Sequence, residues 1–166
     1  MALKYLFAIV CLSSWFTSFS QNPEEWQTLN FESPEDYKNN EDKILECANF
    51  VLTGPAEPTD PARKSAMGAL SKWMSGTPDY SFVIDESISK LMEKNEAVLS
   101  IYMAAMTKYT LENKDKKITP ADLKLNAFEQ LLNYSEVPGN KVPMTRDLKK
   151  AIEAKRKGKL KEYLKI

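Results

Sequence analysis

Apolar residues recur every three or four positions through most of the chain, which is the spacing of one face of an α-helix. Three of these stretches begin with a capping side chain followed by proline, at Ser33-Pro34, Asp60-Pro61 and Thr119-Pro120. Helices commonly start in this way. The alternation typical of strands is confined to Tyr80, Phe82 and Ile84. The pattern therefore predicts an all-α fold, an irregular bundle of six to seven helices.

The helical stretches pair into two predicted hairpins. The first joins residues 33–53 to residues 61–76 through a proline-rich connector, and the second joins residues 95–111 to residues 119–136. Residues 97–111 are apolar nearly all round the helix, with a charge only at Lys108, so we expect this helix at the centre of the bundle. A basic C-terminal helical segment begins after Thr145 and is interrupted at Gly158.

The first twenty residues have the pattern of a secretory signal peptide. Lys4 precedes an apolar run from Tyr5 to Phe16, and Ser18-Phe19-Ser20 has the small residues of a cleavage site. We therefore expect cleavage after Ser20 and a secreted or periplasmic protein without a transmembrane segment in the mature chain. Residues 21–166 then form a single all-α domain, in which residues 21–32 are an acidic arm that could be flexible.

The amino-acid composition excludes several kinds of catalytic and metal site. The chain has no histidine, which excludes Ser-His-Asp and Cys-His catalysis and every histidine-ligated metal or haem site. After cleavage one cysteine remains, Cys47, at the spacing of the apolar residues around it, so we expect a buried thiol. We predict no cofactor and no metal.

Residues 21–60 carry ten acids and two bases, whereas residues 140–166 carry ten bases and three acids. These two ends should attract each other or outside partners.

The least generic passage is Trp73 to Phe82, which combines three aromatic residues, an acid and two turn-forming residues. It could line a ligand groove with Asp79 as the polar anchor. Alternatively, Trp73 and Phe82 fill the core while Asp79 satisfies the turn. With Tyr109-Thr110-Leu111-Glu112-Asn113 and Met144-Thr145, this passage resembles small exported helical proteins of unknown function in Bacteroidota. The resemblance implies an extracytoplasmic helical domain and no particular site.

The basic end could form a second binding surface. Its bases alternate with apolar residues at helical spacing, as in segments that bind lipid headgroups or acidic polymers. For an exported chain, nucleic acid is not the expected anion. The alternative is a solvated last helix that balances the acidic region. The candidate binding residues are thus Trp73, Asp79, Tyr80, Phe82, Lys155, Arg156, Lys157 and Lys159.

Two catalytic patterns deserve comparison with simpler explanations. Ser87-Ile88-Ser89-Lys90 matches the Ser-x-x-Lys of penicillin-recognising enzymes, but the companion Lys-Thr-Gly and Ser-Asp-Asn triplets are missing, so we expect an exposed helical turn. Paired carboxylates could cleave a polymer, yet the N-terminal acids occupy helix starts.

We predict a non-catalytic binding module of the cell envelope or secreted fraction, with an unknown envelope protein or an anionic polymer or lipid surface as partner. The alternatives are a carboxylate-dependent hydrolase of an envelope polymer and peripheral membrane association.

Overall fold

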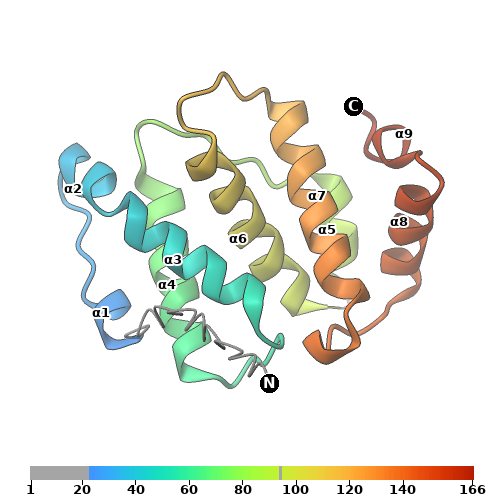
Figure 1. Ribbon diagram of the computed structural model, residues 1–166, viewed down its shortest axis with the longest axis horizontal. Coiled ribbons are helices and arrows are strands. Elements are labelled where there is room, and N and C mark those ends of the chain that lie inside the picture. The colour runs from blue at the N-terminus through green and yellow to red at the C-terminus, as the bar shows by residue number, and fades with distance from the viewer. Residues whose placement is uncertain (1–22, 94) are drawn as a thin grey trace, which may run out of the picture.

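The computed structural model describes residues 23–93 and 95–166. It has helices and no strand in these ranges, which confirms the predicted all-α class (Figure 1). The predicted signal peptide and its cleavage site lie outside the described residues. The helices are α1 Pro23–Gln27, α2 Pro34–Asn39, α3 Glu41–Thr53, α4 Pro61–Gly76, α5 Glu86–Met92, α6 Glu96–Glu112, α7 Pro120–Glu136, α8 Arg146–Arg156 and α9 Leu160–Leu164, with a 3-10 turn η1 at Pro138–Asn140.

The described ranges therefore contain more helices than the six or seven predicted. The stretch expected as one helix over residues 33–53 divides at Asn40, whose backbone N–H and side-chain amide both bond to the Asp36 carbonyl. Asparagine side chains compete in this way with the regular helical ladder. The N-terminal arm also forms a short helix, in which Trp26 is buried and stacks near Phe50 with ring centroids 5.1 Å apart. A large side chain thus holds the described part of the arm on the bundle.

The predicted helix starts are present. Ser33 accepts a hydrogen bond from the Asp36 N–H and Thr119 accepts one from the Asp122 N–H, and in both cases the acid bonds back to form a capping box. Gly158 has a φ of +68°, a left-handed conformation that glycine adopts without strain. This residue separates α8 from α9, as the sequence indicated.

Both predicted hairpins form, from α3 with α4 and from α6 with α7. Helix α6 lies at the centre, where it contacts α3, α4, α5 and α7 (Figure 1). One side of α6 joins a hydrophobic cluster with α7, α8 and α9, in which Tyr102 meets Phe128 edge-on at 5.2 Å. The other side contributes Ala104 and Leu111 to a second cluster with α1, α3 and α4. The central position follows from a helix that is apolar nearly all round.

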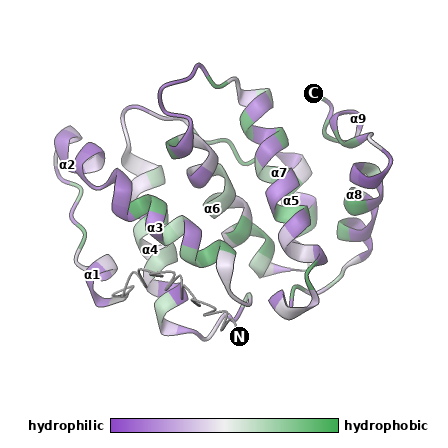
Figure 2. Ribbon diagram, in the orientation of Figure 1, coloured by the Kyte–Doolittle hydropathy of each residue, from purple (hydrophilic) through white to green (hydrophobic). Residues whose placement is uncertain are grey.

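The acidic and basic ends of the chain lie at opposite ends of the molecule, α1 and α2 at one and α8 and α9 at the other (Figure 1). Polar residues dominate these outer helices, whereas apolar residues concentrate on α3 and α6 (Figure 2). Lys141 pairs with Glu57 at 3.1 Å, but Lys150, Lys155 and Arg156 of α8 pair with acids nearby. No helix in the described ranges combines the length and apolar character needed to cross a membrane.

Candidate anion-binding groove

The residues of the predicted aromatic binding surface are only partly exposed to solvent. Trp73 is fully buried, so its assignment to a binding surface was wrong. Its indole N–H donates to the Tyr37 carbonyl at 3.0 Å. The rings of Tyr80 and Phe82 lie against it at 5.5 and 5.8 Å, because the loop after α4 must cover this large apolar side chain. Phe82 is half-buried, whereas Asp79 is exposed and Tyr80 keeps part of its surface.

We call residues 77–85 the aromatic loop and residues 113–119 the lysine loop. A buried acid links the two. Glu41, only 7% exposed, accepts a hydrogen bond from the Tyr80 hydroxyl at 3.0 Å and pairs with the Lys114 ammonium at 2.9 Å. Burial, together with the bond to the Glu41 carboxylate, raises the pKa of Tyr80 to about 12. Tyr80 therefore stays a neutral donor at physiological pH and fixes the aromatic loop beside the lysine loop.

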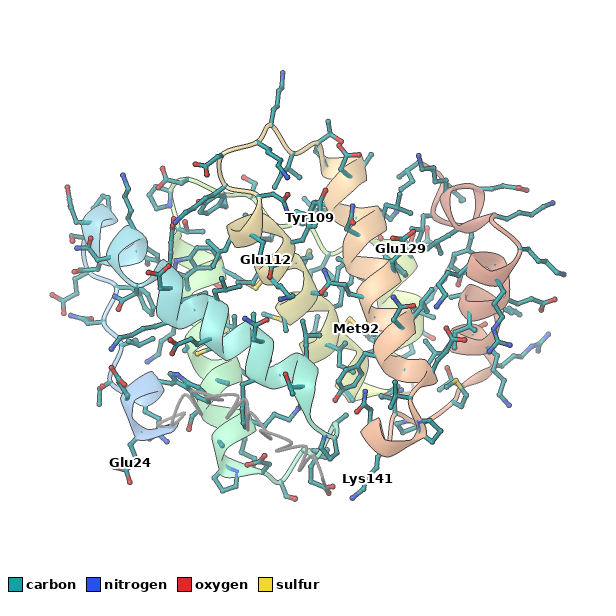
Figure 3. The ribbon with its side chains drawn as sticks, in the orientation of Figure 1. Glu24, Met92, Tyr109, Glu112, Glu129 and Lys141 are labelled. Atoms are coloured by element: carbon teal, nitrogen blue, oxygen red, sulfur yellow. The ribbon has the colours of Figure 1, made fainter. Side chains whose placement is uncertain are left out.

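Between the two loops lies a groove of about 390 Å³ at the C-terminal end of α6. Figure 3 marks this end by Tyr109 and Glu112. The lining joins both loops, the last turn of α6 and the first turn of α7: Asp79, Tyr80, Ser81, Thr110, Lys114, Lys116, Lys117, Ile118, Thr119, Pro120 and Leu123. The groove brings together two of the predicted binding residues, Asp79 and Tyr80, with a loop in which the sequence had indicated no site.

Donor groups in this lining are not all used within the protein. Thr110 is 4% exposed, and its hydroxyl has no hydrogen-bond partner among the described residues. Lys116 donates to the Asn113 side chain at 2.8 Å, whereas Lys117 makes no ion pair or hydrogen bond in the described part of the chain. Of the three lining lysines, Lys114 is already paired with Glu41, which leaves Lys116 and Lys117 with Asp79 as the charged groups that the described lining offers to a ligand. Buried polar groups normally find partners, so the arrangement suits a ligand that carries oxygen acceptors.

The basic end offers less free charge than the sequence suggested. Lys155 and Arg156 both pair with Glu136 on α7, and hydrogen bonds from these two bases hold the pKa of Glu136 below its usual range. Lys157 pairs with Glu153 at 2.7 Å, and Lys159 lies 3.9 Å from Glu162. All four predicted residues thus have an acidic neighbour. Leu160 and Leu164 are buried in the core, whereas Tyr163 is half-buried and Ile166 is exposed.

The Ser-x-x-Lys motif forms no nucleophile. Lys90 pairs with Glu86 at 2.7 Å. The Ser87 hydroxyl instead accepts from Lys124 at 3.1 Å, and the same ammonium pairs with Asp85 at 2.6 Å and donates to the Leu164 carbonyl at 2.8 Å. Burial alone would raise the pKa of Asp85, but bonds from Lys124 and the Ser87 N–H hold it below its usual range. An ammonium so engaged cannot act as a base, because a base needs a free lone pair. The contacts tie α5, α7 and the C-terminus together.

The N-terminal acids are also engaged structurally. Asp36 caps α2, Glu25 pairs with Lys43, and Glu41 holds Tyr80 and Lys114. Cys47 is fully buried, as predicted, and burial raises the pKa of its thiol to about 12.

Sequence reasoning missed Thr110 and the three lysines of the groove. The dense charge of Lys114-Asp115-Lys116-Lys117 was a usable signal, but the pattern of a polar loop gave no reason to place it beside Tyr80. No family model, curated protein or solved structure matches the chain.

Proposed function

We propose that this chain is an exported, non-catalytic binding protein whose groove between the aromatic loop and the lysine loop holds an acidic polysaccharide. The observation that carries the proposal is the groove itself, in which the buried Thr110 hydroxyl lacks a partner and Lys117 is unpaired among the described residues. The proposal of export rests on the sequence of the first twenty residues.

The chemistry of the lining favours a charged sugar. Lysine ammonium groups attract carboxylate or sulfate groups without demanding a planar geometry. The hydroxyls of Ser81 and Thr110 can exchange hydrogen bonds with sugar hydroxyls, since each is both donor and acceptor. Ile118, Pro120 and Leu123 provide apolar surface for the C–H faces of a sugar ring. The volume of about 390 Å³ falls within the usual size of small-molecule sites, about 300–1,000 Å³.

The same contacts argue against the two alternatives. A hydrolase needs two carboxylates facing one bond. Asp79 is the acid among the described lining residues, whereas Glu41 already holds Tyr80 and Lys114 and Asp122 is engaged in the capping box with Thr119. Peripheral membrane association needs several exposed apolar side chains on the basic segment, and Leu160 and Leu164 are buried, which leaves Ile166 as the exposed large apolar residue after α8.

The test is binding of the purified protein to polygalacturonate, with fully methyl-esterified polygalacturonate as the uncharged matched polymer. We expect calorimetry to show binding of the charged polymer that weakens as salt is raised, because salt screens exposed charges. Lys116→Gln with Lys117→Gln should abolish most of it. Lys149→Gln with Lys150→Gln on α8 is the matched control and should bind normally.

The binding results distinguish the groove from the basic C-terminal end as the site of binding. Equal binding of both polymers would exclude a role for the lysine charges. Loss in the α8 pair rather than the groove pair would move the site to the basic end. Mass spectrometry of protein recovered from the exported fraction tests localisation separately, with Gln21 as the expected first residue.

A further inference from the structure

A second site lies at the other end of α6, around a buried arginine. Arg63, in the first turn of α4, is 6% exposed. Its Nη1 donates to the Val51 carbonyl at 2.9 Å and to the Pro55 carbonyl at 3.2 Å. Its Nη2 has no hydrogen-bond partner among the described residues, and no carboxylate of those residues pairs with it. The Tyr134 hydroxyl lies close enough for the Arg63 charge to counteract the rise that burial causes in the Tyr134 pKa, but Nη2 itself stays without a hydrogen bond. Buried charges are costly unless they are paired and fully hydrogen-bonded, so this guanidinium is only partly satisfied.

The contacts that Arg63 makes within the protein use its Nη1 and leave its Nη2 without a role. Val51 lies in the last turn of α3, where carbonyl groups lack helical partners, and Nη1 supplies a donor to it and to the chain that follows. A lysine could do the same with one ammonium group. The planar guanidinium adds a second nitrogen, and arginine typically uses such a pair of donors to hold a carboxylate or phosphate.

Arg63 lines a pocket of about 200 Å³, which we call the Arg63 pocket. Its other lining residues are Ala56, Pro58, Lys64, Met67, Ala97 and Ser100. No acid is among the lining residues whose side chains the structure describes, and Lys64 is free of ion pairs and hydrogen bonds through its ammonium among the described residues. Of those described lining residues, Ala56, Pro58, Met67 and Ala97 are apolar. The pocket thus combines an apolar wall with positive charge and is separate from the groove, since the start of α4 and the start of α6 lie opposite the lysine loop (Figure 1).

Helix α6 forms one wall of the pocket, because Ala97 and Ser100 belong to its first turns. The side-chain amide of Asn95, which precedes the helix, donates to the Pro143 carbonyl at 2.9 Å. Two independent features therefore meet at the pocket: a buried guanidinium whose Nη2 is unused, and a lysine without an ion pair among the described residues.

We propose that the Arg63 pocket binds a small organic monocarboxylate, with the carboxylate on the Arg63 guanidinium and an apolar body against Ala56, Pro58 and Met67. A cavity of about 150 Å³ admits benzene, so a pocket of about 200 Å³ takes a six-carbon ring or chain with its carboxylate. A polymer does not fit this volume, and the inference does not rest on the polysaccharide groove.

Benzoate is the probe, and benzamide is its uncharged counterpart of nearly the same shape. In ¹H–¹⁵N spectra of the purified protein, benzoate should shift the amides of Ala97 and Ser100, and benzamide at equal concentration should not. Arg63→Lys should weaken benzoate binding by about tenfold or more, since a hydrogen bond to a charged group contributes about 1.5–3 kcal/mol. Because this variant can also disturb α3, Ala97→Leu serves as a second one, filling the pocket while leaving Arg63 in place.

Lys64→Gln and Lys72→Gln form a matched pair on α4, since only Lys64 lines the pocket. We expect weaker benzoate binding in the first and unchanged binding in the second. Equal shifts with benzoate and benzamide would overturn the carboxylate assignment, and unchanged affinity in Ala97→Leu would overturn the location. Unaltered benzoate binding in the Lys116→Gln and Lys117→Gln protein is expected whether or not the groove binds polysaccharide, so the two proposals fail separately.

Discussion

Removal of the Tyr80 hydroxyl tests the link between the aromatic loop and the rest of the bundle. In Tyr80→Phe the ring still packs on Trp73 at 5.5 Å, and only the 3.0 Å hydrogen bond to Glu41 is lost. Hydrogen bonds to charged groups contribute about 1.5–3 kcal/mol. Glu41 keeps its pair with Lys114 on its other oxygen, so we expect a loss near the lower limit, about 1.5 kcal/mol of unfolding free energy.

Urea unfolding followed by circular dichroism measures this change. With a slope of about 2 kcal/mol per molar urea, the midpoint should fall by about 0.7 M. Tyr37→Phe is the matched control because the Tyr37 hydroxyl has no hydrogen-bond partner among the described residues, and its cost should stay below about 0.5 kcal/mol. If the two variants lose equal stability, the Tyr80–Glu41 bond contributes nothing and the reasoning about the loop is refuted.

Four further measurements test other parts of the structure. Gly76→Ala places a methyl group 1.9 Å from the Tyr37 hydroxyl oxygen and should cost about 1–3 kcal/mol of unfolding free energy through overpacking. Gly68→Ala, with open space around it, is the control, and thermal unfolding should show it to be neutral or stabilising. Folding raises the pKa of Tyr80 to about 12 from about 10 in the unfolded chain. The folded state therefore binds more protons between these values, and stability should fall from pH 10 to pH 12. Tyr80→Phe should make that slope shallower without removing it, because burial also raises the pKa of Tyr102, Tyr134 and Tyr163. Lys124→Met should cost about 1–3 kcal/mol and speed hydrogen exchange in α9, while unchanged exchange would refute its role in holding the C-terminus. In a chain that begins at Gln21, Cys47 should react with a thiol reagent only as fast as the protein unfolds, since burial raises its pKa to about 12; rapid labelling under native conditions would contradict its burial.

Local signals in the sequence predicted the regular parts of the fold. Capping residues followed by proline marked the starts of α2, α4 and α7, and apolar spacing identified the core faces of the helices and the central place of α6. These features depend on neighbours within one helical turn, which a single sequence displays directly. The division at Asn40 was missed because the apolar period continues across it.

The candidate site was harder to predict because it depends on contacts between distant residues. The sequence left open whether Trp73 lined a groove or filled the core, and the structure supports the core, since the chain folds Tyr80 and Phe82 back over it. Lys114 lies 73 positions from Glu41 in the sequence, and only their ion pair shows that the lysine loop faces the aromatic loop. Nothing in the local pattern marked Thr110 or Arg63 as buried groups with unused donors.

The shared position of α6 has a consequence for how the protein unfolds. Its two sides belong to different hydrophobic clusters, so neither cluster can open without exposing one side of the same helix. The molecule should therefore behave as a single cooperative unit. Native-state amide exchange should be slowest in the middle of α6 and occur there only through global opening, while α1 and α9, which are five-residue helices at the two ends, exchange through local fraying.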